Sequence, residues 1–91
     1  MGLTGKRDTE GLVVVQCKRY APENKVGLPA ILNFKGAMLD HKAWRGYFVT
    51  TSTFTTGARE SAKMSPNLFL VDIDDLIRWQ SEPPDSRQRF T

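Results

Sequence analysis

The stretch that decides the fold reads VVVQCKRY and runs from Val13 to Tyr20. Its first half is a run of β-branched residues between a glycine and a turn that contains proline and asparagine, which predicts a buried strand over about residues 11–19. Side chains two positions apart on a strand lie on the same face, so we expect Gln16 and Lys18 to project together. On the residues alone, this polar pair is either a strand end that meets solvent or part of a site.

Along the chain, segments with the hydrophobic pattern of a strand alternate with segments that have the pattern of a helix. A polar segment at 6–11 ends in glycine and predicts a turn that follows a short strand of about residues 2–5. The downstream sequence predicts, in order, a helix over 27–41, a strand over 46–51, a helix over 56–64 with a threonine cap at Thr55 or Thr56, a strand over 67–71 and a short helix capped by Asp74. Such alternation predicts an α/β fold with a largely parallel sheet covered by helices.

Size and composition predict one small globular domain. The chain has 91 residues, of which 40% are hydrophobic and 25% charged. We expect the domain to occupy residues 1–81 and a flexible tail to follow over 82–91. No apolar run approaches the roughly 18 residues of a membrane span, and no apolar signal segment follows the first charges, so we expect no membrane partner. The single cysteine, Cys17, indicates a reducing, cytoplasmic setting.

Positive charge is concentrated in the first two thirds of the chain. Residues 1–25 carry five Lys/Arg against three acids, and residues 26–65 carry five against two. Residues 66–91 reverse the balance, with three against five. This distribution allows the basic part to face phosphates, although a solvated surface explains the net charge of +3 equally simply.

The pair Gln16 and Lys18 suits metal-assisted hydrolysis of a phosphodiester. A glutamine carbonyl is an oxygen ligand for a divalent ion. A lysine held beside the ion can orient the attacking water or stabilise the negative charge that develops on the phosphate. The pair lacks a carboxylate, which a hard cation prefers.

The sequence QCKRY after a valine run resembles the third core strand of the Mrr-type (type IV) restriction endonucleases. These are members of the PD-(D/E)xK superfamily that carry Gln in place of the acidic residue. The segment GYFVTTSTFT at Gly46–Thr55, followed by Ala58 and Ala62, is similar to a strand-to-helix segment of the same family. Further matches follow in the same order, at residues 26–38 for the central helix and in the last strand and helix, so the resemblance covers about residues 11–80.

The resemblance implies a restriction-endonuclease-like three-layer core around a mostly parallel sheet, without the family's first helix and strand. It implies an endodeoxyribonuclease of a restriction system that cuts duplex DNA, including modified foreign DNA, with Mg²⁺ or Mn²⁺. The implied catalytic residues are Gln16 and Lys18, and Gln16 is also the implied metal ligand. The implied DNA contacts are Arg19, Tyr20, Thr51, Ser52, Thr55 and Lys35. For the hydroxyl residues, helix capping is the alternative role.

The front of the chain departs from the family pattern. The family places a metal-binding Asp about 13 residues before the Gln, and that position falls near Leu3. Asp8 is the nearest carboxylate and a candidate metal ligand, although it lies in the predicted turn. We expect that the chain is truncated at its N-terminus. The absent first helix should leave one face of the sheet uncovered, which favours a homodimer or strand exchange.

The sequence leaves functions from two classes open. The first is a metal-dependent endonuclease domain whose target is chosen by a separate recognition domain or subunit. The second is a non-catalytic nuclease fold that binds DNA or a partner protein. A third arrangement completes the active site in trans, with another chain supplying the aspartate.

Overall fold

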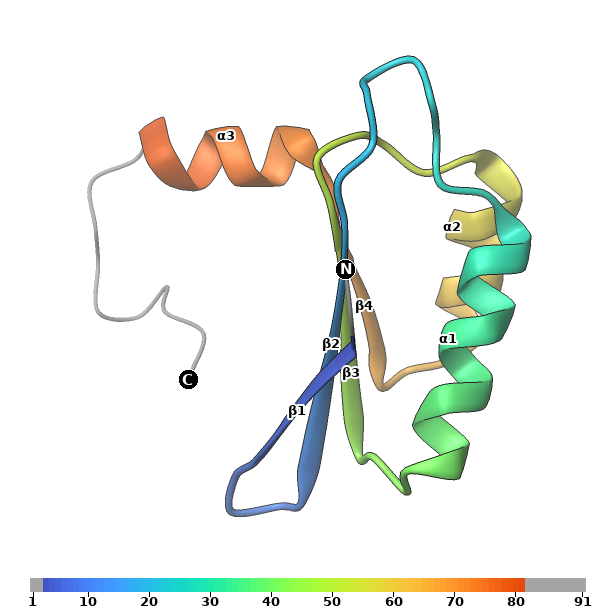
Figure 1. Ribbon diagram of the computed structural model, residues 1–91, viewed down its shortest axis with the longest axis vertical. Helices are drawn as coiled ribbons and strands as arrows, with labels where there is room; N and C mark the ends of the chain where they lie inside the picture. Colours follow the sequence, from blue (N-terminus) through green and yellow to red (C-terminus); the bar gives the residue numbers. More distant parts are fainter. Residues whose placement is uncertain (1–2, 82–91) are drawn as a thin grey trace.

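The computed structural model describes residues 3–81, and its elements follow the predicted order. They are β1 (Leu3–Arg7), β2 (Leu12–Lys18), α1 (Leu28–Asp40), β3 (Arg45–Thr50), α2 (Thr56–Lys63), β4 (Leu68–Val71) and α3 (Ile73–Ser81). The sheet has the strand order β1-β2-β3-β4, in which β1 is antiparallel to β2 and the other pairs are parallel (Figure 1). The predicted α/β fold with a mostly parallel sheet is therefore confirmed. The predicted tail at 82–91 lies outside the described residues.

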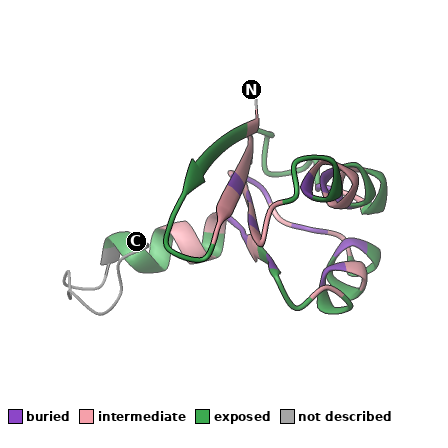
Figure 2. Cartoon of the chain, turned by 90° about the horizontal axis from the view of Figure 1, so that it is seen from below, coloured by how far each residue is buried: buried purple, intermediate pink, exposed green. Residues whose placement is uncertain are grey.

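The helices lie on both sides of the sheet and form three layers with it. α1 and α2 pack against one face, and α3 lies on the opposite side, near the C-terminal ends of the parallel strands (Figure 1). The hydrophobic core lies between the sheet and the α1–α2 layer, and Figure 2 shows buried segments on the sheet and on both of these helices. At its centre, the Phe48 ring meets Phe34 and Phe54 edge-on, with ring centroids 5.4 and 5.7 Å apart. This core fixes α1 over β2 and β3.

Gly46 allows α1 to approach β3 closely. A Cβ atom at this position would lie 2.6 Å from the sulfur of Met38 and 2.9 Å from a ring carbon of Phe34. Only glycine fits here without displacing a core side chain. The close approach lets Met38 and Phe34 of α1 pack directly on β3 where Gly46 pairs with Val14 of β2.

The helix starts are set by local side chains, with one correction to the sequence prediction. Thr55 caps α2 as predicted, since its hydroxyl accepts a backbone N–H from the first turn at 3.1 Å. The predicted cap of the last helix, Asp74, is wrong, because α3 begins at Ile73. Its cap is Asp72, whose carboxylate accepts from the backbone N–H of Asp75 at 3.0 Å. Asp75 in turn accepts from the backbone N–H of Asp72 at 3.1 Å, which completes a capping box.

β1 and β2 form a hairpin that is closed by residues 8–11. Gly11 has a φ of +142°, a conformation that side-chain-bearing residues rarely adopt. β1 reaches further toward this turn than the predicted 2–5, and its register places Leu3 directly opposite Gln16. Leu3, where the resemblance places the family's metal-binding Asp, is thus the cross-strand neighbour of Gln16.

α3 covers only one end of the sheet face that lies opposite α1 and α2. Below α3, no described element packs on this face (Figure 1). Val13, Val15 and Val49 nevertheless line a groove there. No helix within residues 3–81 is long and apolar enough to cross a lipid bilayer. The uncovered sheet face predicted from the sequence is therefore present in the described part of the chain.

Candidate active site

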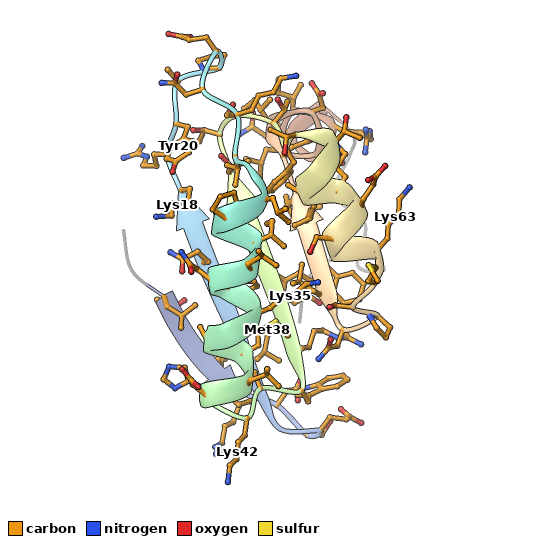
Figure 3. All side chains as sticks on the ribbon, turned by 90° about the vertical axis from the view of Figure 1, so that its right-hand side faces the viewer. Lys18, Tyr20, Lys35, Met38, Lys42 and Lys63 are labelled. Atoms are coloured by element: carbon orange, nitrogen blue, oxygen red, sulfur yellow. The ribbon has the colours of Figure 1, made fainter. Side chains whose placement is uncertain are left out.

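Gln16 and Lys18 lie together on the side of β2 that faces α1, as the strand period predicts. They line a pocket of about 280 Å³ near the C-terminal ends of the parallel strands. The full lining is Gln16, Lys18, Tyr20, Ala30, Asn33, Phe34 and Phe48. Figure 3 shows Lys18 and Tyr20 at the same end of the molecule, beside the start of α1. The polar pair therefore lies in a partly open pocket between β2 and α1.

Asn33 is the polar side chain that α1 contributes to this pocket. Ala30, Asn33 and Phe34 lie three and four positions apart and so share one face of the helix. Asn33 is exposed and its neighbour Phe34 is buried, so the amide stands at the rim of an apolar floor. The sequence prediction missed Asn33, because the helix was interpreted through its apolar stripe alone. A polar residue within that stripe was the available signal.

Thr51 fixes the segment that follows Lys18. Its hydroxyl accepts from the backbone N–H of Tyr20 at 3.0 Å and donates to the Tyr20 carbonyl at 2.9 Å. The backbone N–H of Thr51 donates to the Lys18 carbonyl at 3.2 Å. Three hydrogen bonds thus tie the end of β2 to the end of β3. Arg19 and Tyr20 remain exposed beyond this clamp.

The other predicted hydroxyl contacts are engaged inside the protein. Ser52 is fully buried, and its hydroxyl donates to the Pro22 carbonyl at 3.2 Å. Thr55 caps α2. These bonds hold the loop after β2 against the start of α2, so both hydroxyls shape the pocket end of the domain.

Lys35 lies between α1 and α2 and away from the pocket (Figure 3). Its ammonium group donates to the Ser61 carbonyl at 2.8 Å, and its side chain is partly buried. This bond links the two helices of one layer. The structure therefore does not bring Lys35 together with Gln16 and Lys18.

Asp8 lies at the opposite end of the β1–β2 hairpin from Gln16. One of its carboxylate oxygens accepts from the backbone N–H groups of Glu10 and Gly11, at 2.9 and 3.1 Å, and from the Trp44 indole N–H at 3.0 Å. The hairpin turn is five residues from Gln16 along β2, or roughly 17 Å at the strand rise. An ion bound by Gln16 is out of reach of Asp8, whose role in the structure is to close the turn.

Leu3 occupies the position from which a carboxylate would reach the pocket. Directly opposed side chains of an antiparallel pair lie about 5 Å apart and on one face. Leu3 faces Gln16 in this way, and its half-buried side chain packs against the core.

The pocket therefore offers only uncharged oxygen donors, from Gln16, Asn33 and the Tyr20 hydroxyl. Residues 3–81 contain no group of three or more His, Cys, Asp or Glu side chains that could hold a metal ion. Hard divalent ions are held mainly by carboxylates. This donor set alone does not fit Mg²⁺ or Mn²⁺.

The buried carboxylate at the end of β4 belongs to a separate structural cluster. Asp72 pairs with Arg59 at 2.7 Å and caps α3. Burial acts to raise the pKa of Asp72, but the backbone hydrogen bond from Asp75 and the Arg59 guanidinium outweigh it and hold the pKa below its usual value. Asp72 is therefore ionised at neutral pH, and both of its carboxylate oxygens accept hydrogen bonds, one from Arg59 and one from the backbone N–H of Asp75.

The three-layer architecture is that of a restriction-endonuclease-like fold, and the sequence comparison identifies the family. Residues 2–80 match the restriction endonuclease family of Mrr type, so the chain belongs to that family. The family predicted from the QCKRY strand is therefore confirmed.

Two relatives illustrate the similarity. The chain is 43% identical over 70 residues to the type IV methyl-directed restriction enzyme EcoKMrr of Escherichia coli (strain K12), covering 77% of this chain and 22% of that protein. Its fold is similar to that of the DNA modification-dependent restriction endonuclease AspBHI, with a TM-score of 0.63 at 17% identity, over 84% of this chain and 20% of that one. The chain thus spans about a fifth of the length of these relatives.

Proposed function

We propose that this chain is the catalytic domain of a cytoplasmic restriction endonuclease that hydrolyses phosphodiester bonds of duplex DNA carrying foreign modifications. The observation that carries the proposal is the placement of Gln16 and Lys18 in one pocket at the strand ends, in a chain of the Mrr-type family. The names of the two relatives, methyl-directed and modification-dependent, support modified DNA as the target class.

In this proposal Lys18 acts on the scissile phosphate. Its ammonium group stabilises the negative charge that grows on the phosphate oxygens as water attacks. The amides of Gln16 and Asn33, on opposite walls of the pocket, orient the phosphate and the attacking water. Arg19 and Tyr20 continue from the pocket onto the exposed surface and contact the DNA backbone. Thr51 acts indirectly, because it fixes Tyr20.

Family membership supports Mg²⁺ or Mn²⁺ as the cofactor, and the pocket, which has no acidic side chain in its lining, then requires a carboxylate from elsewhere. Another part of a longer protein, or a second chain acting in trans, would supply it. We assign target choice to a separate recognition domain or subunit. A homodimer is the alternative partner.

A non-catalytic DNA-binding module is the second candidate function. The observation that favours it is the pairing of Gln16 with Leu3, where an apolar side chain stands in place of an acid. Under this function the pocket would hold a DNA phosphate without cleaving it.

Incubation of the purified chain with supercoiled plasmid and Mg²⁺ or Mn²⁺ separates these functions. Lys18→Ala is compared with Lys63→Ala, which removes an exposed lysine from the far side of α2 (Figure 3). Because the chain itself supplies no carboxylate at the pocket, all three proteins also carry Leu3→Asp, which places one opposite Gln16. The endonuclease proposal expects nicking that Lys18→Ala abolishes and Lys63→Ala retains. Salt-dependent DNA binding without cleavage by any of the three proteins would establish the binding module instead. Absence of both activities would overturn the proposed role in DNA restriction.

A further inference from the structure

α1 carries apolar side chains on two of its faces. The first face is buried in the core and consists of Ile31, Phe34 and Met38. The second face is turned to solvent and includes Leu28, Leu32 and Leu39, with exposed fractions of 39%, 52% and 78%. A surface helix normally has a single apolar face and is polar elsewhere. The second face therefore indicates a packing partner that residues 3–81 do not supply.

The solvent-exposed apolar face has the spacing of a contact between two helices. Its members are four, three and four residues apart, as in the seam of a coiled coil, and form the outer stripe of α1: Leu28, Leu32, Lys35 and Leu39. Figure 3 views the layer of α1 and α2 from outside, and no described element lies over α1. A Cβ atom at Gly36, beside the stripe, would meet nothing within 4 Å, which leaves room for a partner's side chains.

Lys35 does not bring a free charge into the outer stripe. Its ammonium group is bound to the Ser61 carbonyl of α2 at 2.8 Å, and its side chain is partly buried. The methylene stem is therefore the part of this side chain that a partner meets. The stripe is thus apolar along its whole length.

The spacing of the outer stripe is the same in both directions along the helix. An antiparallel copy of α1 therefore brings Leu28 opposite Leu39 of the second copy. In the same register, Leu32 comes opposite the apolar stem of Lys35. The two helix dipoles then run in opposite directions, which is favourable. A parallel copy would instead place Lys35 against Lys35, two like charges in one contact.

From this symmetry we infer that the outer stripe is the contact between two copies of this chain, related by a two-fold axis that crosses α1 near its middle. The inference does not rest on the proposed nuclease activity. It places the homodimer contact on the helix layer and not on the uncovered sheet face. Asn33 follows Leu32 and so points about 100° away around the helix, which leaves both active-site pockets open in the dimer.

Other occupants fit the outer stripe less well. Duplex DNA would require cations for its phosphates, and the one cation of the stripe, Lys35, is already bound to Ser61. A helix of another protein would need only an apolar side, and the matching of the stripe with its own reverse would then have no role.

The dimer should be weak and reversible. α1 has 13 residues and is therefore about 20 Å long. Together with the adjacent α2, it gives a contact area of roughly 20 by 20 Å, or about 400 Å², from each copy. This is about half of the area that a stable complex buries on each partner. We therefore expect association at protein concentrations of roughly 0.1–1 mM.

Sedimentation equilibrium of the full chain up to about 2 mM tests the inference. The average mass should rise from one copy toward two. Leu32→Glu places a carboxylate in the contact twice, because of the two-fold symmetry, and should raise the dissociation constant roughly tenfold or more. Ile77→Glu is the matched control, since Ile77 lies on α3 and is 53% exposed, against 52% for Leu32. It should leave the association unchanged.

Cross-linking with a short bismaleimide tests the antiparallel register. Leu28→Cys and Leu39→Cys are prepared separately, each together with Cys17→Ser. A mixture of the two proteins should give a linked dimer that neither gives alone. Identical positions of the two copies lie about 16 Å apart along an antiparallel pair, beyond the reach of the reagent.

Four results would overturn the inference. They are a single copy at every concentration, a dimer that Leu32→Glu leaves intact, equal weakening by Ile77→Glu, and cross-linking of each cysteine variant with itself. Leu39→Glu, at the most exposed position of the stripe, replaces Leu32→Glu if the latter changes the circular dichroism spectrum. The same weakening is expected of it.

Discussion

Replacement of Leu3 by aspartate should create the charge that the candidate active site lacks. The register places residue 3 opposite Gln16 and on the same face. At a separation of 4 Å, two unit charges in water attract by about 1 kcal/mol, so a divalent ion gains about 2 kcal/mol from one carboxylate. That gain corresponds to a roughly 30-fold lower dissociation constant for Mn²⁺.

The substitution should leave the fold intact. Full burial of a leucine side chain is worth about 1.5–3 kcal/mol, and Leu3 is only half-buried, so its loss should cost about 1–1.5 kcal/mol. A small domain with a stability of about 5 kcal/mol or more tolerates this loss.

Isothermal titration with Mn²⁺ measures the gain, and Thr4→Asp is the matched control. Thr4 is the next residue of β1, lies opposite Val15 and points to the other face of the sheet. Both variants add one carboxylate, but only Leu3→Asp adds it beside Gln16. Equal Mn²⁺ affinity of the two variants, or an unchanged affinity of a folded Leu3→Asp protein, would refute the geometry. Plasmid nicking by Leu3→Asp but not by Thr4→Asp would extend the result to catalysis.

Three further predictions concern the parts that support the pocket. Because the pKa of Asp72 is lowered in the folded state, its stabilisation is present at neutral pH and is lost as the pH falls below about 4; Asp72→Asn should lower the free energy of unfolding in urea by about 1 kcal/mol at pH 7 and by less at pH 3. Gly46→Ala should cost about 1–3 kcal/mol in thermal unfolding, since the new methyl group would collide with Met38; an unchanged melting temperature would show that α1 can move away. Thr51→Val should speed hydrogen exchange at the amide of Tyr20, which loses its acceptor, while exchange in the core of β2 stays unchanged.

Much of the fold followed from patterns that are local in the sequence. The valine run and the period of two placed Gln16 and Lys18 on one face, because side-chain direction along a strand depends on the strand alone. The spacing implied by the family resemblance pointed to Leu3, and in the structure the short hairpin turn places that residue opposite Gln16. The start of the last helix was misplaced at Asp74, since Asp72 and Asp74 both lie where a cap can form and only the bonds with the following turn decide between them.

The partners of the polar side chains could not be predicted in the same way. Lys35 reaches Ser61 on another helix, and Thr51 binds the segment after a distant strand. Such bonds depend on tertiary packing and leave no periodic signal in the sequence. Asn33 is a different case, because a polar residue among the apolar residues of the helix was a signal in the sequence, although only the packing of α1 beside β2 shows that it lines the pocket.

The alternation of β2 has a consequence for how this domain can diversify. Even-numbered residues from Val14 to Lys18 face α1 and the pocket, while Val13 and Val15 face the open groove. Substitutions on one side leave the chemistry of the other unchanged. Larger proteins that contain this domain can therefore change the residues on the open side of the sheet while they keep the same residues in the pocket. Substitutions at the even-numbered and at the odd-numbered positions of β2 can therefore be compared separately among related proteins.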